Sequence, residues 1–345
     1  MFDAVNDNKY CQIPRGTPVL VTGATGFTGM VLIKKLVEAG LMVSAYSRES
    51  SNRDPLNDLN LKWFIGDIAD EKKLQQAVMG QEYVFHLAAA LRDTKSTKQE
   101  YWNTHVRSTQ IICEEALKNP EFKRYIHVST VGVHGHIDNP PATEEYRFNP
   151  GDDYQRTKLD AEIWLIKFAR ENSFPYTIIR PAAIYGPGDK RLLKLFKMSV
   201  KPFFILLGKG KCMYHLIHVD DLTNAIIIAS THPKARGEVF IIGADEPIAI
   251  AEIAGIVAAH FRKKFRVIRL PIGPFFLAAD MCEAICKPLK IDPPLYRRRV
   301  AFYSKNRHFD VSKMRNVLGY FPQHSNIDGI IETTDWYLAQ GWMKP

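Results

Sequence analysis

The sequence has few cysteines, and their scarcity narrows the class of protein it encodes. Five cysteines in 345 residues are too few and too scattered for a disulfide framework. Cys282 and Cys286 are spaced to share a helical face, but no second pair of ligands accompanies them, so no metal site is predicted. The reduced cytoplasm is therefore the expected location.

No apolar run reaches the roughly 18–20 residues that a membrane span requires. The nearest approach, residues 271–289, is interrupted by three charged side chains. Residues 1–14 carry acids and amides without an apolar core, which predicts an N-terminal extension and not a signal peptide. Peripheral contact with a membrane through residues 271–289 and Arg297–Arg299 stays open beside the alternative of a buried amphipathic helix next to a solvated loop.

Acidic residues are fewer than basic ones: the chain has 46 Lys and Arg and 37 Asp and Glu, which gives a net charge of +9. Such an excess suits a phosphate-bearing ligand, an anionic membrane surface or nucleic acid. The basic residues are spread along the chain without a nucleic-acid-binding motif, so no nucleic-acid partner is expected. With 46% hydrophobic and 24% charged residues, the composition is that of a globular protein of about two domains.

Short apolar runs alternate with amphipathic stretches through the first half of the chain. Strands are predicted at 19–22, 42–46, 61–65, 83–87, 124–129 and 176–180, and helices at 29–39, 71–79, 99–118 and 153–171. This alternation predicts an α/β fold with a Rossmann-type doubly wound parallel sheet over residues 15–180. Residues 181–345 are expected to form mainly a smaller C-terminal substrate-binding domain, some of whose strands return to the main sheet. Within it, a helix over 310–318 is predicted, with Asp310 as its N-cap and Gly319 as its stop.

A glycine-rich loop follows the first predicted strand, in the segment Thr22-Gly-Ala-Thr-Gly-Phe-Thr-Gly29. Glycines between a strand and a helix let the backbone turn tightly and approach a pyrophosphate, and the helix N-terminus offers free N–H groups to the phosphates. The loop predicts a dinucleotide site formed by Gly23, Thr25, Gly26, Phe27 and Gly29.

The end of the second predicted strand indicates which dinucleotide is preferred. An acidic residue there would bind the ribose hydroxyls of NAD, but Ser47 and Arg48 occupy the position and suit a 2′-phosphate. NADP is therefore favoured, and NAD remains the alternative. Asp67 and Ile68 follow the third strand and are placed to contact the adenine. The small residues after the fourth strand are expected along the cofactor: Leu87, Ala88 and Ala89.

A tyrosine and a lysine at helical spacing supply the predicted acid/base. Among the 14 tyrosines only Tyr154 has a lysine four residues later, Lys158. Residues four apart share one helical face, and an ammonium there lowers the pKa of a phenol from its usual value of about 10. Ser129 and Thr130 end a predicted strand, at the sheet edge where ligands bind, and supply hydroxyls for the substrate oxygen.

In these motifs the chain resembles the extended short-chain dehydrogenases/reductases of the epimerase/dehydratase and 3β-hydroxysteroid dehydrogenase kind. The likeness covers residues from about 17 to 342 and includes the glycine loop, His86–Ala89, Tyr-x-x-x-Lys, Arg180–Gly188 and His218–Asp221. It implies that Thr130 is the catalytic hydroxyl and Tyr154 the acid/base. It also implies that Lys158 binds the nicotinamide ribose, that Pro181 packs near the nicotinamide, and that the protein is a homodimer.

Departures from that family's pattern bear on the reaction. Val131 and Gly132 follow the catalytic hydroxyl where family dehydratases carry an Asp-Glu pair, which disfavours dehydration. Tyr214 stands where many nucleotide-sugar epimerases carry an arginine for the diphosphate. His105 stands where a supporting asparagine is usual, so the proton relay differs or His105 has no role in it.

The sequence thus predicts an NAD(P)-dependent dehydrogenase or reductase acting on a secondary alcohol or ketone, on a bulky, apolar, hydroxysteroid-like small molecule. Ala90, Tyr185 and Tyr214 are expected to contact the substrate. Two alternatives stay open. One is an NAD-dependent nucleotide-sugar 4-epimerase, in which Arg191, Lys194 or Lys209 would hold the diphosphate. The other is a non-catalytic nucleotide-sensing protein.

Overall fold

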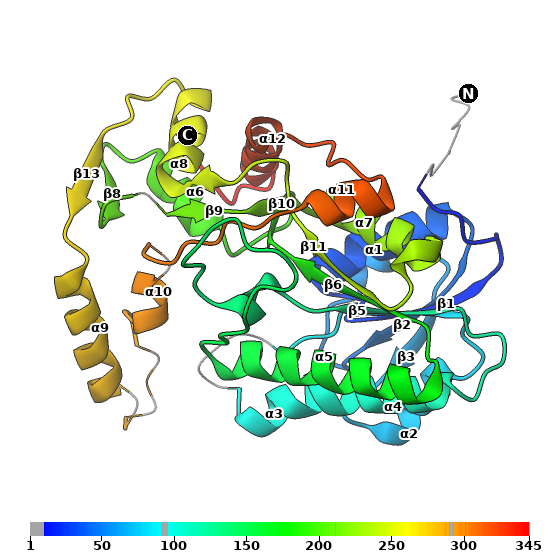
Figure 1. Ribbon diagram of the computed structural model, residues 1–345. Coiled ribbons are helices and arrows are strands. Elements are labelled where there is room, and N and C mark those ends of the chain that lie inside the picture. The colour runs from blue at the N-terminus through cyan, green and yellow to red at the C-terminus, as the bar shows by residue number, and fades with distance from the viewer. Residues whose placement is uncertain are drawn as a thin grey trace, which may run out of the picture.

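A seven-stranded parallel sheet lies at the centre of the computed structural model, which describes residues 10–344 except 91–95, 211, 287, 290, 292 and 302, without the side chains of 298 and 299. The strand order is β11-β6-β5-β4-β1-β2-β3 (Figure 1). Its strands are β1 (Pro18–Thr22), β2 (Met42–Ser47), β3 (Lys62–Ile65), β4 (Tyr83–His86), β5 (Arg124–Val128), β6 (Tyr176–Pro181) and β11 (Glu238–Ile242). The order reverses between β4 and β1, so the carboxyl ends of these strands border the crevice where ligands bind in such sheets.

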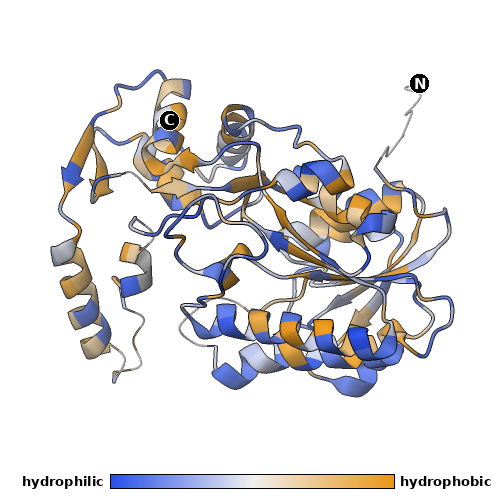
Figure 2. Cartoon of the chain, in the orientation of Figure 1, coloured by the Kyte–Doolittle hydropathy of each residue, from blue (hydrophilic) through white to orange (hydrophobic). Residues whose placement is uncertain are grey.

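Helices cover both faces of the sheet, which confirms the predicted doubly wound α/β fold (Figure 1). On one face lie α1 (Phe27–Glu38), α7 (Val219–Thr231) and α11 (Ser312–Leu318). On the other lie α2 (Glu71–Val78), α3 (Lys98–Trp102), α4 (Ser108–Ala116) and α5 (Asp153–Asn172). Hydrophilic and hydrophobic residues alternate along α5, as expected of a helix with one face against the sheet (Figure 2).

The second half of the chain builds a smaller assembly with its own apolar core. Three two-stranded pairs belong to it: β7 (Ala183–Tyr185) with β10 (Leu216–His218), β9 (Met213–Tyr214) with β12 (Ile248–Ala249), and β8 (Phe204–Leu207) with β13 (Val267–Leu270). Its helices are α6 (Leu193–Ser199), α8 (Ile250–His260), α9 (Gly273–Cys286), α10 (Arg297–Ala301) and α12 (Asn326–Ala339). One strand of this half, β11, pairs with β6 and so extends the main sheet.

Two local predictions differ from the structure. The helix predicted over 99–118 is divided, because a π-helical turn (Asn103–Arg107) separates α3 from α4. The predicted N-cap Asp310 lies one residue too early, since α11 is preceded by Val311, although the Asp310 carboxylate does accept the backbone N–H of Ser312 at 2.7 Å. The predicted stop is confirmed: Gly319 ends α11 in the left-handed conformation.

Short single-turn helices complete the described chain at Asp54–Leu56, Val131–His134 and Pro233–Ala235. Within the described residues, every helix is too short or too polar to cross a bilayer.

Candidate active site

A cleft of about 2120 Å³ runs along the carboxyl ends of β1, β2, β4, β5 and β6 and continues between α6, α9 and α10. All of the residues predicted to bind cofactor or to act in catalysis line its first half. They are Gly23, Thr25, Gly26, Phe27, Gly29, Ser47, Arg48, Asp67, Ile68, Leu87, Ala88, Ala89, Ser129, Thr130, Tyr154, Lys158 and Pro181. The structure thus gathers these predicted residues around one cavity, and their roles remain predictions.

The backbone of the glycine loop lies so close to neighbouring backbone that side chains would not fit at Gly23 or Gly29. Gly23 has φ +70°, and a Cβ there would lie 2.8 Å from the backbone nitrogen of Ala88. A Cβ on Gly29 would lie 2.2 Å from the carbonyl oxygen of Gly23. The loop leads into the N-terminus of α1, whose first turn contains no acidic residue. Close backbone approach at a helix N-terminus fits the phosphates of a dinucleotide.

Buried hydrogen bonds from His86 fix the wall opposite the glycine loop. The Thr22 hydroxyl lies 2.7 Å from His86 Nδ1 and accepts the backbone N–H of Ala88, while His86 Nε2 lies 3.1 Å from the Ser108 hydroxyl. Because Ser108 donates its own proton to the Thr104 carbonyl at 2.6 Å, Nε2–H donates and Nδ1 accepts. Burial lowers the pKa of His86 to about 3, so the ring is neutral and holds the 87–89 segment against Gly23.

The part of the cleft that follows β2 presents a buried hydroxyl and a cation. The Ser47 Oγ is buried and makes no hydrogen bond to the described residues, and Arg48 lines the cleft beside it. Asp67 is held by local contacts: its carboxylate accepts the N–H of Ala69 at 2.8 Å, and its carbonyl accepts the Tyr46 hydroxyl at 2.8 Å. A hydroxyl left without a partner beside a guanidinium fits the ribose end of a dinucleotide.

The predicted acid/base pair lies in the first turns of α5. Asp152 caps this helix by accepting the Gln155 N–H at 2.8 Å, which places Tyr154 at the edge of the cleft. Lys158, one turn later, is 1% exposed and donates to the Val128 carbonyl at 2.8 Å. Burial lowers the pKa of Lys158 from 10.5 to about 8. One of its three N–H groups is used by Val128, so the others are available within the cleft.

Two hydroxyls follow β5 at the same edge. Thr130 Oγ1 accepts the N–H of Gly132 at 3.0 Å, which leaves its own proton available for donation into the cleft. The Ser129 Oγ is buried and has no hydrogen-bond partner among the described residues. Both side chains belong to the lining, next to Tyr154.

The π-helical turn places His105 behind the tyrosine. Its Nδ1 lies 2.8 Å from the Thr157 hydroxyl, and its Nε2 accepts the backbone N–H of Ala90 at 3.3 Å. Because Thr157 donates its proton to the Asp153 carbonyl at 2.8 Å, the imidazole donates through Nδ1 and is neutral. The ring meets that of Tyr154 edge to face, with centroids 5.1 Å apart. The sequence analysis identified His105 but did not predict these contacts, because a π-helical turn has no sequence signal that distinguishes it from an ordinary helix.

The second half of the cleft combines an apolar wall with several cations. Its apolar side chains come from α6, β8, α9, the segment before α10, and α10: Leu195, Met198, Ile205, Leu207, Phe275, Phe276, Leu295 and Val300. Its cations are Arg191, Lys194, Arg297, Lys305 and Arg307, against one acid from this region, Glu283. Most of these residues were not predicted, because their positions depend on how distant segments pack.

Three residues that the sequence analysis named for the substrate end do not line the cleft. Tyr185 does not line the cleft; it is 1% exposed and packs edge to face on His218 at 5.4 Å. Tyr214 is 2% exposed and also lies outside the lining, because Arg307 covers it, donating to its hydroxyl at 2.7 Å and stacking over its ring at 5.0 Å. Lys209 is absent from the lining, whereas Ala90 belongs to it.

One group of potential metal ligands lies away from the cleft. His218, Asp220, His324 and Glu332 bring one ligand atom each within 4.8 Å of one another. The two imidazoles stack with centroids 3.9 Å apart and planes at 27°. Their in-plane lone pairs therefore run nearly side by side instead of converging on one ion, and we assign no metal to this group.

A family comparison agrees with this geometry. The family described as the NAD dependent epimerase/dehydratase family matches residues 19–243, which include the glycine loop, Tyr154 and Lys158. This segment spans the main sheet from β1 to β11.

Individual relatives cover most of the chain. An uncharacterized Sinorhizobium fredii protein, y4nG, is 32% identical over 93% of this chain and 78% of its own length. A UDP-glucose 4-epimerase of Vibrio cholerae is 25% identical over 93% of this chain and 95% of its own. A 3beta-hydroxysteroid-dehydrogenase/decarboxylase, isoform 2, of Arabidopsis thaliana is 26% identical over 92% of this chain and 61% of its own.

Proposed function

Since the chain belongs to the NAD dependent epimerase/dehydratase family, we propose that it is an NAD(P)-dependent oxidoreductase that interconverts a secondary alcohol and a ketone. A bound nicotinamide would accept or supply the hydride. The observation that carries the proposal is the convergence of Thr130, Tyr154 and Lys158 on the cleft beside the glycine loop.

The chain's own residues handle the proton and the substrate oxygen. Tyr154 takes the alcohol proton during oxidation and returns it during reduction. The Lys158 ammonium, one helical turn away, stabilises the phenolate electrostatically and would hold the nicotinamide ribose. Thr130, whose oxygen already accepts from Gly132, donates its proton to the substrate oxygen and orients it.

The shape of the second half of the cleft supports a bulky apolar substrate that bears a polar or anionic group. Aromatic and aliphatic side chains from α9 and β8, including Phe275, Phe276 and Leu207, offer a surface for a fused-ring or other lipid-like body. The likeness to a hydroxysteroid dehydrogenase/decarboxylase agrees with this choice. Arg191 and Lys305 of the same cavity supply cations for the polar group.

One observation favours a second candidate, a nucleotide-sugar 4-epimerase. Arg307 lies in the lining and stacks on Tyr214, so a guanidinium reaches the region in which a sugar-nucleotide diphosphate would bind even though Tyr214 replaces the expected arginine. The likeness to a UDP-glucose 4-epimerase points the same way. Such an enzyme would retain its dinucleotide through dialysis, whereas a dehydrogenase would exchange it.

For the cofactor we propose NADP in preference to NAD. Two observations support this proposal: Arg48 lines the cleft, and the Ser47 hydroxyl beside it has no hydrogen-bond partner among the described residues. Arg48→Asp should lower the ratio of NADP to NAD affinity by about 10- to 100-fold, because it replaces an attractive charge with a repulsive one. An unchanged ratio would contradict this preference.

The reaction class is tested with hydroxysteroids and UDP-sugars, each with NAD and NADP, by following the reduced nicotinamide at 340 nm and the epimeric products by chromatography. Tyr154→Phe should lower kcat by about 10²- to 10⁴-fold while the dinucleotide affinity stays within a factor of about two. Tyr83→Phe is the matched control, since Tyr83 lies at the amino end of β4, away from the cleft. Normal turnover in Tyr154→Phe would refute the mechanism, and conversion of UDP-sugars alone would favour the epimerase.

A further inference from the structure

Helix α9 (Gly273–Cys286) is apolar on two sides, and only one of them is covered. Toward the protein, Phe275 and Phe276 face the cleft and Ala279 is fully buried. On the opposite side Leu277, Met281 and Ile285 follow one another at intervals of four residues and are 65%, 58% and 62% exposed. Residues four apart share a helical face, so these three side chains form one continuous stripe.

This stripe is unusual for a helix at the surface of a protein. A surface helix normally turns charged and polar residues outward and keeps one apolar face for the core. Here the two charged residues of α9 are used elsewhere, since Glu283 lines the cleft and Asp280 is engaged by Arg297. Only Ala279 of α9 is buried, so the helix does not match the alternative of a buried amphipathic helix. The apolar surface also continues past the helix end, where Leu289 and Ile291 are 62% and 57% exposed.

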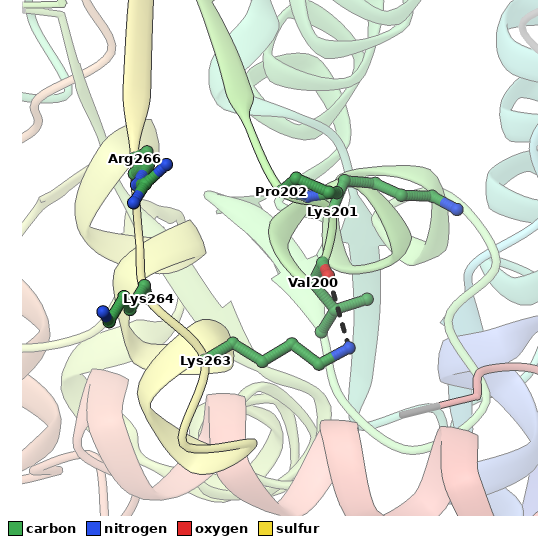
Figure 3. A pocket seen from close by; sticks show the side chains of 6 residues that line it. All are labelled: Val200, Lys201, Pro202, Lys263, Lys264 and Arg266. Atoms are coloured by element: carbon green, nitrogen blue, oxygen red, sulfur yellow. Dashed lines mark hydrogen bonds between the residues drawn. The ribbon is translucent and has the colours of Figure 1, made fainter.

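A cluster of cations lies on the same edge of the molecule. Lys201, Lys263, Lys264 and Arg266 surround a depression of about 370 Å³ that no acidic residue lines (Figure 3). Lys263 donates to the Val200 carbonyl at 3.4 Å, and the four cations form no ion pair with the described residues. Their ammonium and guanidinium groups therefore keep their positive charge available to an anionic partner.

The cluster and the stripe are joined by one short strand. β13 begins directly after Arg266, and three residues after it ends α9 begins. A strand of four residues spans only about 13 Å. Figure 1 shows β13 and α9 following one another down the side of the molecule that lies away from the N-terminus. In Figure 2 much of α9 carries hydrophobic colours.

We propose that this edge docks the protein on an anionic lipid surface, with Leu277, Met281 and Ile285 inserted at the level of the headgroups and with Lys263, Lys264 and Arg266 against the lipid phosphates. The helix lies in the interface and does not cross it, because 14 residues reach only about 21 Å. Neither the apolar stripe nor the cation cluster alone gives stable attachment, whereas the two together do.

Charge complementarity favours a lipid surface over a second copy of this chain. An identical copy would bring the same stripe and the same cations, and no acidic residue lines the depression that the cations surround. Anionic headgroups supply the missing negative charge. The proposal uses the cations before β13, because Arg297 is paired with Asp280 and the side chains of Arg298 and Arg299, also named in the sequence analysis, lie outside the described ones.

The docking surface does not depend on which substrate the cleft takes, although it lies on the outer side of the helix that walls the substrate half. Phe275 and Phe276 on the inner side and Leu277 on the outer side belong to the same turns of α9. An apolar substrate that leaves the bilayer at this surface would therefore enter the cleft past α9. That consequence rests on the proposed function, and the docking itself does not.

The test is sedimentation of the full chain with vesicles of phosphatidylcholine alone and with about 30 mol% phosphatidylglycerol added, at about 0.1 M salt. Binding should be at least tenfold tighter to the anionic vesicles and should weaken with added salt. Leu277→Ser/Met281→Ser/Ile285→Ser should lower the affinity at least tenfold. Lys263→Glu/Lys264→Glu/Arg266→Glu should abolish the preference for anionic vesicles, because each cation near such a surface contributes about fivefold.

Met42→Ser/Met79→Ser/Leu117→Ser is the matched control, since these side chains are 59%, 65% and 44% exposed and belong to the main sheet domain. It should bind vesicles as the wild type does. Circular dichroism and dinucleotide binding establish that each variant is folded, and the charge variant still tests the proposal if the α9 variant fails to fold. Equal binding to both vesicle types, or a stripe-dependent dimer by analytical ultracentrifugation without vesicle binding, would overturn it.

Discussion

Replacing Lys158 by methionine should stabilise the cofactor-free protein while it abolishes turnover. The lysine is 1% exposed, and burial lowers its pKa from 10.5 in the unfolded chain to about 8. Because folding disfavours the charged form, the free-energy cost is complete at pH values below about 8 and is gone above 10.5. Methionine fills a similar volume without carrying a charge into the core.

The size of the effect follows from that pKa. At pH 7 the buried ammonium costs about 3 kcal/mol, and at pH 9.5 about 1 kcal/mol. The substitution also removes the hydrogen bond to the Val128 carbonyl, whose loss costs about 1–2 kcal/mol at either pH. Lys158→Met should therefore be more stable than the wild type by about 1–2 kcal/mol at pH 7 and about equal to it at pH 9.5.

The assay is urea unfolding at both pH values, followed by circular dichroism, with the dinucleotide absent. Lys167→Met is the control, because its side chain is 76% exposed on the same helix and should give the same small difference at both pH values. The decisive quantity is the change of about 2 kcal/mol between pH 7 and pH 9.5, which the lost hydrogen bond does not affect. A Lys158→Met difference that is independent of pH would refute the reasoning.

Three further predictions concern the glycine loop and two ion pairs. Gly23→Ala should weaken dinucleotide binding at least tenfold in a titration, because the new Cβ meets backbone at 2.8 Å and φ is +70°; unchanged affinity would mean that the loop does not hold the pyrophosphate. The hydrogen bond to Asp221 raises the pKa of His324, so the stability that the charged pair contributes is fully present at acidic pH and is lost as the pH rises through the raised pKa. His324→Gln should therefore cost about 1–2 kcal/mol at pH 6 and less at pH 8.5 in thermal melts. An equal cost at both pH values would argue against the charged pair. Arg180→Met should destabilise by about 3–5 kcal/mol in urea unfolding, since it leaves the Glu162 carboxylate, now 2.6 Å from the guanidinium and 1% exposed, without its partner; Arg180→Met/Glu162→Met should recover most of this loss, and no recovery would contradict it.

The sequence by itself determined the sheet and the residues that line the first half of the candidate site. Short apolar runs predict the strands. The glycine loop and the pair Tyr154 and Lys158 are recognised by the spacing of residues that are near one another in the sequence. Residues that are near in sequence stay near one another in the folded protein, so these motifs come together once the order of the strands in the sheet is set. The same locality explains why the stop at Gly319 was predicted correctly.

Only the tertiary structure decided the substrate half and the outer surface of α9. The sequence pattern predicts that Tyr185 and Tyr214 contact the substrate. Packing instead buries Tyr185 against His218 and Tyr214 beneath Arg307. Nothing in the sequence of α9 distinguishes the apolar residues that face the cleft from those that face outward. Which side of a helix is covered depends on segments elsewhere in the chain, and packing between such segments leaves no periodic signal in either one.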